Sequence, residues 1–279
     1  MFDLTRPLSR LVFLALLASI GTFLFFPLYW LVSTSFKTNA ELFRVVPTIV
    51  PLAPTLENFV DALTRGTLPR NLLNSVIAAG GSAILTTVLA TCAGFSFAKY
   101  RYRGRIPLMY ALLAAQVIPH GVLLISVYPM LSDWNLLNTY PGLILAYLTL
   151  ALPAGCYMMY SYFVNLPHEL IEAARADGAS ELLIMRRIVL PISWPAVITV
   201  FLYAFMWAWN DLQFAMTILT ATEMRTVGPG LLYNYLNEQT ANWGAAMAAS
   251  LLAALPVVIG FSLVQRHFIQ GLTAGAVKS

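Results

Sequence analysis

Charged residues are scarce in this sequence. Its 279 residues include only 16 Lys and Arg and 12 Asp and Glu, a charged fraction of 10%, compared with about 25% in an ordinary soluble domain. Hydrophobic residues make up 59% of the chain. A water-soluble globule of this size cannot bury so much apolar surface, whereas a bilayer solvates it. The composition therefore excludes a soluble globular protein and indicates a membrane protein.

Cysteine and histidine are also rare, with two and three copies. Cys92 and Cys156 both lie inside apolar blocks, which predicts small packing residues rather than a disulfide framework. The stretch HELIE, residues 168–172, begins like the zinc-protease helix motif but has Glu172 where the second histidine must stand. Neither a metal site nor a Ser/His/Asp catalytic set is indicated, so a membrane enzyme is disfavoured.

The sequence has no Gly-x-x-x-x-Gly-Lys-Ser/Thr loop, the segment whose backbone cradles nucleotide phosphates. We therefore expect no cofactor on this chain, and the energy for any uphill transport must come from a partner. The net charge of +4 does not indicate a nucleic-acid partner, because Lys and Arg are normally enriched on the inner face of membrane proteins.

Six apolar blocks are each long enough to cross a bilayer. About 20 helical residues span the roughly 30 Å hydrocarbon core, and lipid tolerates only helices or closed barrels. Alternating barrel segments are missing, so we predict an all-α membrane protein with six transmembrane helices in one domain, residues 1–279. The first block is followed by Lys37 rather than a small-residue cleavage site, which favours a retained span. The predicted spans cover about residues 11–34, 71–98, 106–131, 140–164, 191–219 and 243–264.

The distribution of Lys and Arg predicts the orientation of these spans. If both termini lie on one side, that side carries eleven of the 16 basic residues, including those of the segment 99–105. The other side carries Lys37, Arg44, Arg65, Arg70 and Arg225. We therefore expect a multi-pass protein with both termini in the cytoplasm.

Two segments are predicted on the outer side. In residues 35–70, prolines forbid a regular helix until Thr55, which can cap a short amphipathic helix lying on the membrane surface. Residues 221–242 form the second outer loop and are placed to touch an external protein.

A polar stretch, EAARADGASELLIMRRIVLP at residues 172–191, separates the fourth and fifth spans. Glu169 and Glu172 put negative charge near the start of a helix, Gly178 offers a left-handed cap, and Ser180 can cap a second short helix. Composition alone leaves two interpretations open: a helical hairpin that merely joins two spans, or a rigid element shaped to dock in a groove of another protein.

The spacing within this stretch resembles the cytoplasmic motif of the membrane subunits of binding-protein-dependent ABC importers. That motif is Glu-Ala-Ala, three residues, Gly, nine residues, Ile, any residue and Leu-Pro, and this chain matches it with Glu172, Ala173, Ala174, Gly178, Ile188, Leu190 and Pro191. The rest of the chain is similar to the carbohydrate importers of the maltose-system G type, through FPLYWLVSTSFK, PTLENFVDAL, NSVIAA, YPGLILAY, LPHELIEAARADGAS, AWNDLQFA and FIQGLTAGAVKS.

This resemblance implies the type I importer permease fold, with a coupling helix in the loop 165–190 that docks on a cytoplasmic ATPase. Glu172, Asp177 and the other motif residues would make that contact, and Gly271, Gly275 and Lys278 of the tail 266–279 would reach between the ATPases. The implied partners are a second, homologous permease subunit in a heterodimer, two ATPases that bind ATP and Mg²⁺, and an external solute-binding protein. The implied location is the bacterial inner membrane.

Polar groups within the spans are candidates for the translocation path. Trp209, Asn210 and Asp211 near the outer end of the fifth span have two equally weighted interpretations: an interfacial anchor, or a cavity wall that stacks on a sugar ring and binds its hydroxyls. Gln116 and His120 of the third span are further candidates, although a hydrogen-bonded structural histidine beside Pro119 is the simpler interpretation.

The alternative class is a secondary transporter or channel that works alone; such proteins often have membrane-embedded ion ligands, and only Asp211 qualifies. The substrate expected from the resemblance is a sugar, oligosaccharide or polyol. Glycerol phosphate and its diesters remain open.

Overall fold

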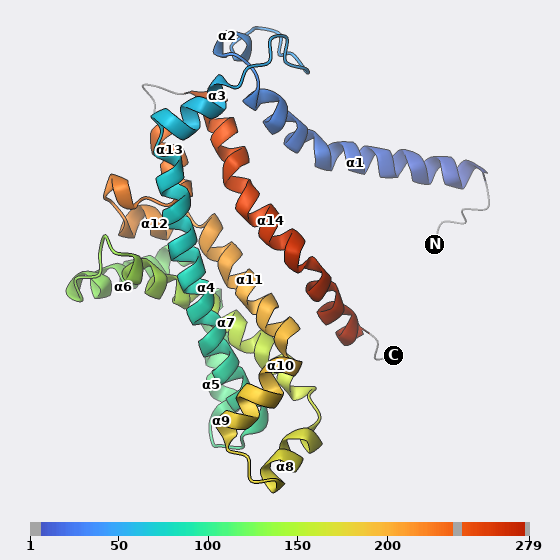
Figure 1. The fold of residues 1–279 in the computed structure, drawn as a ribbon, viewed down its shortest axis with the longest axis vertical. Coiled ribbons are helices and arrows are strands. Elements are labelled where there is room, and N and C mark those ends of the chain that lie inside the picture. The colour runs from blue at the N-terminus through green and yellow to red at the C-terminus, as the bar shows by residue number, and fades with distance from the viewer. Residues whose placement is uncertain (1–6, 237–241, 277–279) are drawn as a thin grey trace. The chain divides into compact units, whose positions relative to one another are not determined.

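The computed structural model describes residues 7–236 and 242–276, and within these ranges it contains helices and loops but no β-strand (Figure 1). The predicted all-α fold is confirmed. The chain divides into two compact units. Unit 1 comprises Met1–Leu68 and Leu231–Leu255, and unit 2 comprises Pro69–Gly230 and Pro256–Ser279.

Among the described residues, four helices are long and apolar enough to cross a membrane, and two bent helix pairs bring the number of crossings to six if each pair is one span. The long helices are α1 (Pro7–Ser35), α4 (Leu68–Lys99), α7 (Tyr140–Val164) and α14 (Trp243–Ala276). In the first bent pair, α5 (Arg105–Ala114) meets α6 (His120–Asp133) at 105°. In the second, the segment that ends with α10 (Leu190–Ile192) meets α11 (Trp194–Asn210) at 81°.

The third and fifth spans therefore differ from the continuous helices that the sequence predicted. A short 3₁₀ turn, Ala115–Val117, ends the first half of the third span, and Ile118 is extended because Pro119 disfavours a helical residue before it. The fifth predicted span, 191–219, stops at Asn210, and a separate helix α12 (Gln213–Ile218) follows an extended Asp211. Hydrophobicity predicted where these spans lie in the sequence, but it did not predict where their helices break.

Helix α4 has its small and polar residues on the packed side and its large apolar residues on the exposed side. Positions that recur every three or four residues, such as Ser82, Thr86 and Ala90, are buried, whereas Ile84 and Val88 are exposed. This is the reverse of a soluble amphipathic helix and suits a helix that faces lipid, because small residues let neighbouring helices approach closely. A Cβ atom added at Gly94 would lie 2.6 Å from that of Met159 on α7, so α4 and α7 nearly touch there.

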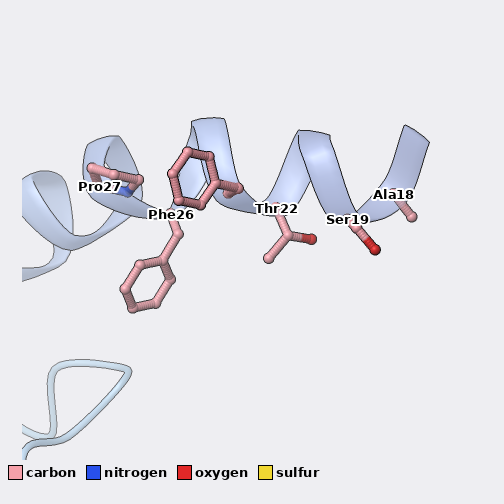
Figure 2. A pocket seen from close by; sticks show the side chains of 6 residues that line it. Ala18, Ser19, Thr22, Phe26 and Pro27 are labelled. Atoms are coloured by element: carbon pink, nitrogen blue, oxygen red, sulfur yellow. The ribbon is translucent and has the colours of Figure 1, made fainter. Parts of the chain in front are cut away.

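Helix α1 of unit 1 exposes apolar side chains along its length, and none of its most apolar 18-residue stretch is buried. Figure 2 shows a hollow along this helix that Ala18, Ser19, Thr22, Phe26 and Pro27 line together with Phe23. Such a surface suits lipid or another apolar helix.

The segment after α1 is built around buried polar residues of unit 1. It contains α2 (Asn39–Leu42), α3 (Glu57–Val60) and a π-helical turn, Asp61–Arg65. The Thr55 hydroxyl accepts the Glu57 N–H at 3.1 Å, close to the capping role predicted for it. The buried Asn58 amide donates to the carbonyls of Ser35 and Lys37, at 2.9 and 2.8 Å, which joins α3 to the end of α1.

Candidate functional site

The polar stretch between the fourth and fifth spans forms two short helices with a sharp bend. Helix α8 (His168–Ala176) is followed by α9 (Glu181–Ile184), and a π-helical turn, Met185–Val189, leads into α10. Gly178 at the bend has φ +80°, and the Ser180 hydroxyl accepts the Leu183 N–H at 3.4 Å to cap α9. The predicted left-handed glycine and serine cap are both present. We call residues 168–184 the α8–α9 hairpin.

The hairpin divides the residues of the Glu-Ala-Ala motif between two faces. Ile171 and Ala174 are buried in an apolar cluster with Phe163 and Ile184, which fixes α8 to the end of α7. Glu172, Ala173 and Asp177 are exposed. Ala174 therefore packs inward, whereas a partner can touch the exposed motif residues of α8 and the bend, which are Glu172, Ala173, Asp177 and Gly178. Farther along, Ile188 and Leu190 are half-buried and Pro191 is exposed.

Glu181 ties the hairpin to the end of α4. Its Oε1 accepts a hydrogen bond from Arg175 Nε and its Oε2 one from the Tyr100 hydroxyl, each at 2.7 Å. The hydrogen bond to Glu181 raises the pKa of the Arg175 guanidinium above its ordinary value. Beside them, Lys99 Nζ donates to the Leu166 carbonyl at 2.7 Å. The hairpin is thus held by side chains from the ends of α4 and α7.

A second feature of unit 2 is a cavity of about 240 Å³ at the break of the third span. The predicted Gln116 and His120 both line it. The His120 ring packs edge-to-face with Trp207, with ring centroids 4.7 Å apart, and the Tyr203 hydroxyl interacts with the side chains of Gln116 and Trp207. We call it the span-break cavity; its lining consists of Ala115, Gln116, His120, Leu123, Thr149, Leu150, Tyr203 and Trp207.

Tyr203, Trp207 and Thr149 were not predicted as site residues. The available signal was the spacing of Tyr203 and Trp207, four residues apart on one helix, which puts both aromatic rings on one face. It was masked because Trp, Tyr and Phe recur throughout the fifth span, at positions that also serve packing and the interface.

Trp209, Asn210 and Asp211 lie elsewhere. Trp209 is buried and stacks on Phe205 with centroids 5.4 Å apart, and Asn210 is exposed, where its amide donates to Met206 of its own helix. Asp211 caps α12 by accepting the Ala215 N–H at 2.9 Å. The Asp211 carboxylate holds two helices together, and the two roles considered for this segment, cavity wall and interfacial anchor, stay predictions.

Other predicted site residues lie at the end of the chain. Gly271 and Gly275 belong to α14, and Lys278 lies outside the described residues. In the described parts of the chain, no three His, Cys, Asp or Glu residues come together as metal ligands would.

Apolar, partly broken crossings with a polar hairpin between the predicted fourth and fifth spans suit a membrane permease subunit. The chain belongs to the family described as binding-protein-dependent transport system inner membrane component, whose profile matches residues 90–274.

Relatives cover nearly the whole chain. The chain is 32% identical to the diacetylchitobiose uptake system permease protein DasC of Streptomyces coelicolor over 255 residues, 91% of this chain and 92% of that one. It is 33% identical to the trehalose/maltose transport system permease protein MalG of Thermococcus litoralis, with 91% of each chain covered. The inner membrane ABC transporter permease protein YcjP of Escherichia coli is 33% identical over 98% of both chains.

Solved structures share the fold. A chain of a bacterial ABC transporter involved in the import of the acidic polysaccharide alginate superposes with a TM-score of 0.83, at 19% identity, over 96% of this chain and 99% of that one. At this identity the likeness establishes the architecture alone.

Proposed function

We propose that this chain is the translocation subunit of an ATP-driven importer for a sugar, oligosaccharide or related polyol. It carries solute across the inner membrane by alternating access. Its partners are a second, homologous permease subunit, two cytoplasmic ATPases that bind ATP and Mg²⁺, and an external solute-binding protein. The relatives named for diacetylchitobiose and for trehalose and maltose support the substrate class, because each is about one third identical over more than nine tenths of its length.

The α8–α9 hairpin is the observation that carries the ATP-driven mechanism. Its exposed edge presents Glu172, Ala173 and Asp177, with the small Ala173 beside the two acids. Its base is fixed by the buried Ile171 and by the hydrogen bonds of Glu181. An element that transmits movement must be fixed to its own subunit at one end, here called its base, and accessible to the partner at the other, here called its tip. When a partner ATPase moves the tip, this base passes the movement to α4 and α7.

The orientation follows from the same proposal. If the hairpin meets a cytoplasmic ATPase, both termini lie in the cytoplasm, in line with the excess of Lys and Arg on that side. The last turns of α14, with Gly271 and Gly275, then extend toward the ATPases. The segment 35–65 and the helix α13 (Val227–Tyr235) face outward and are available to the solute-binding protein.

Co-purification and transport test this function together. We expect the ATPase to co-purify with the intact membrane complex and to be lost from the Glu172→Lys variant, because a reversed charge at the tip repels the basic site that would bind a glutamate. Glu57→Lys makes the same charge change at an exposed site on α3 and serves as the matched control. Accumulation of solute by this chain alone, driven by protons or sodium, would contradict the proposal.

A further inference from the structure

The span-break cavity lies near the middle of the crossing. Thr149 is nine residues beyond Tyr140, the first residue of α7, which places it about 14 Å along a helix that crosses roughly 30 Å of hydrocarbon. The break of the third span, between Val117 and His120, lies at the same cavity. At membrane depth, irregular backbone is tolerated where it is buried in protein or lines a water-accessible cavity. The cavity therefore accounts for why irregular backbone is tolerated at this depth.

The lining has the chemistry of a carbohydrate site. Trp207 and Tyr203 supply flat aromatic surface, which suits the C–H face of a pyranose ring. Gln116 offers an amide that both donates and accepts, and His120 offers ring nitrogens. The Thr149 hydroxyl donates to the Ala146 carbonyl at 2.7 Å, which leaves its oxygen free to accept. A few polar groups converging on an aromatic wall are typical of small-molecule sites.

The charge of the lining restricts the class of ligand that can bind in the cavity. None of the described residues that form it is Asp, Glu, Lys or Arg. A phosphate or carboxylate at the middle of the membrane needs a cationic partner, since an unpaired charge there is costly. A neutral polyhydroxylated ligand needs only the hydrogen-bonding groups present. The cavity therefore disfavours glycerol phosphate, an alternative that the sequence left open.

The volume limits how much of a ligand the cavity holds. About 240 Å³ equals the liquid volume of roughly eight water molecules. This is below the range of about 300–1,000 Å³ for sites that enclose drug-sized ligands. One monosaccharide unit matches such a space, whereas an oligosaccharide would have to extend beyond it.

We infer that the span-break cavity is a subsite for one neutral sugar ring, so that this subunit itself binds the transported solute. The inference rests on the proposed function and narrows it. The His120–Trp207 contact holds the aromatic wall in place, Trp207 and Tyr203 stack on the ring, and Gln116 and Thr149 bind its hydroxyls.

The test uses the complete transporter with its solute-binding protein in proteoliposomes. The probes are radiolabelled maltose, trehalose, N,N′-diacetylchitobiose and glycerol 3-phosphate, and variants are assayed with the probe that the wild-type complex accumulates. We expect Trp207→Leu and Gln116→Ala to lower the solute accumulated per ATP by about tenfold, the effect of losing one good contact. Stimulation of the ATPase by the loaded binding protein is measured in parallel and shows whether each variant complex is assembled. Trp194→Leu, at an exposed tryptophan of the same helix, is the control and should transport normally.

The outcomes separate the two proposals. If Trp207→Leu fails to assemble, Gln116→Ala and Thr149→Val decide, because both side chains are exposed and outside the packed core. Normal transport by these two variants overturns the subsite and leaves ATP-driven import intact. Uptake of glycerol 3-phosphate with no uptake of the neutral sugars also overturns the subsite alone. A wild-type complex that takes up solute without ATP contradicts the proposed function itself.

Discussion

The hydroxyl of Tyr147 donates a 3.0 Å hydrogen bond to Oδ2 of Asp211, and both groups belong to unit 2. The same carboxylate accepts the N–H groups of Phe214 at 3.3 Å and Ala215 at 2.9 Å. One side chain therefore caps α12 and fastens it to α7. Tyr147 is only 2% exposed, so removing the carboxylate takes away the partner of a buried hydroxyl.

Asp211→Ala should lower the stability of the purified protein markedly. The change removes a helix cap, which is worth about 1 kcal/mol, and leaves a buried hydroxyl unpaired at about 1–3 kcal/mol. Tyr147→Phe should cost less, because it removes the donor and keeps the cap. Size-exclusion chromatography of heated samples in detergent gives the midpoint of thermal unfolding for both variants. Tyr157→Phe, an exposed tyrosine on the same helix, is the control and should unfold like the wild type. Equal midpoints for Asp211→Ala and the wild type would contradict the role of this carboxylate.

Gly178 adopts φ +80°, and a Cβ atom placed there would meet nothing within 4 Å. Space is therefore available, and only the backbone conformation disfavours a side chain. Gly178→Ala should cost about 1–2 kcal/mol in this left-handed conformation or shift the bend. We expect weaker co-purification of the ATPase, by about tenfold for each 1.4 kcal/mol.

Two further variants show whether the left-handed conformation of Gly178 is the cause of the weaker co-purification. Gly178→Asn should retain more ATPase than Gly178→Ala, because asparagine adopts the left-handed region more readily. Gly260→Ala adds the same methyl group at a helical glycine that also has open space, and it should behave as the wild type. If Asn and Ala at position 178 reduce binding equally, the backbone argument fails.

The local features of the hairpin could be predicted because each depends on neighbouring residues. A glycine before a serine and an acidic first turn specify a bend and a cap, and the structure has both at Gly178 and Ser180. The candidate crossings were predictable for a similar reason, since each needs only a run of apolar residues. In the span-break cavity, Gln116 and His120 could be selected as polar groups within an apolar span. The rest of the lining depends on how α6, α7 and α11 come together, and no local pattern encodes that arrangement.

Asp211 shows most clearly what could not be predicted from the sequence. A carboxylate near the outer end of a span indicated an interfacial anchor or a cavity wall, because charge inside membranes usually faces water or a ligand. Its hydrogen-bond partners, which the sequence did not indicate, are the N–H groups three and four residues ahead and a tyrosine 64 residues earlier. The cap required knowing that the helix stops at Asn210, and the long apolar runs on both sides of this short polar stretch concealed that stop.

Asn74 of α4 should control the mobility of the segment around Glu223 and Arg225. Its buried amide nitrogen donates to both of their carbonyls at 2.8 Å, and its Oδ1 accepts the Tyr140 hydroxyl at 2.7 Å. Asn74→Asp keeps the acceptor and loses both donors. We expect amide exchange in residues 222–230 to speed up by about tenfold or more, since each lost hydrogen bond is worth about 1 kcal/mol.

Hydrogen-exchange mass spectrometry measures this effect by segment. Tyr140→Phe removes only one of the three bonds and should raise the exchange much less. Asn210→Ala removes an exposed asparagine whose amide bonds within its own helix, so it should leave residues 222–230 unchanged. Unchanged exchange in Asn74→Asp would show that other contacts hold the segment.

The segment 41–53 of unit 1 should loosen at acid pH through Glu41. This carboxylate accepts hydrogen bonds from the Thr48 hydroxyl and from the Leu52 N–H, the latter at 3.0 Å. The Thr48 hydroxyl and then the backbone N–H groups lower the pKa of Glu41 below its ordinary value, although burial opposes them. A lowered pKa means that folding favours the ionised form. The stabilisation is therefore complete above the pKa of an unfolded glutamate, about 4.3, and is lost as the pH falls through the lowered native value.

Limited proteolysis or amide exchange of residues 43–53 between pH 7 and pH 3 checks this prediction, with rates corrected for their intrinsic pH dependence. We expect constant protection from pH 7 to about pH 5 and a loss below about pH 4. Glu41→Gln cannot ionise, so it should be less protected at pH 7 and should lose no further protection on acidification. Glu57→Gln changes an exposed acid of the same segment and should follow the wild-type curve. A wild-type protein that loses protection as the pH rises, or a Glu41→Gln protein that keeps the full pH dependence, would assign the effect to another group.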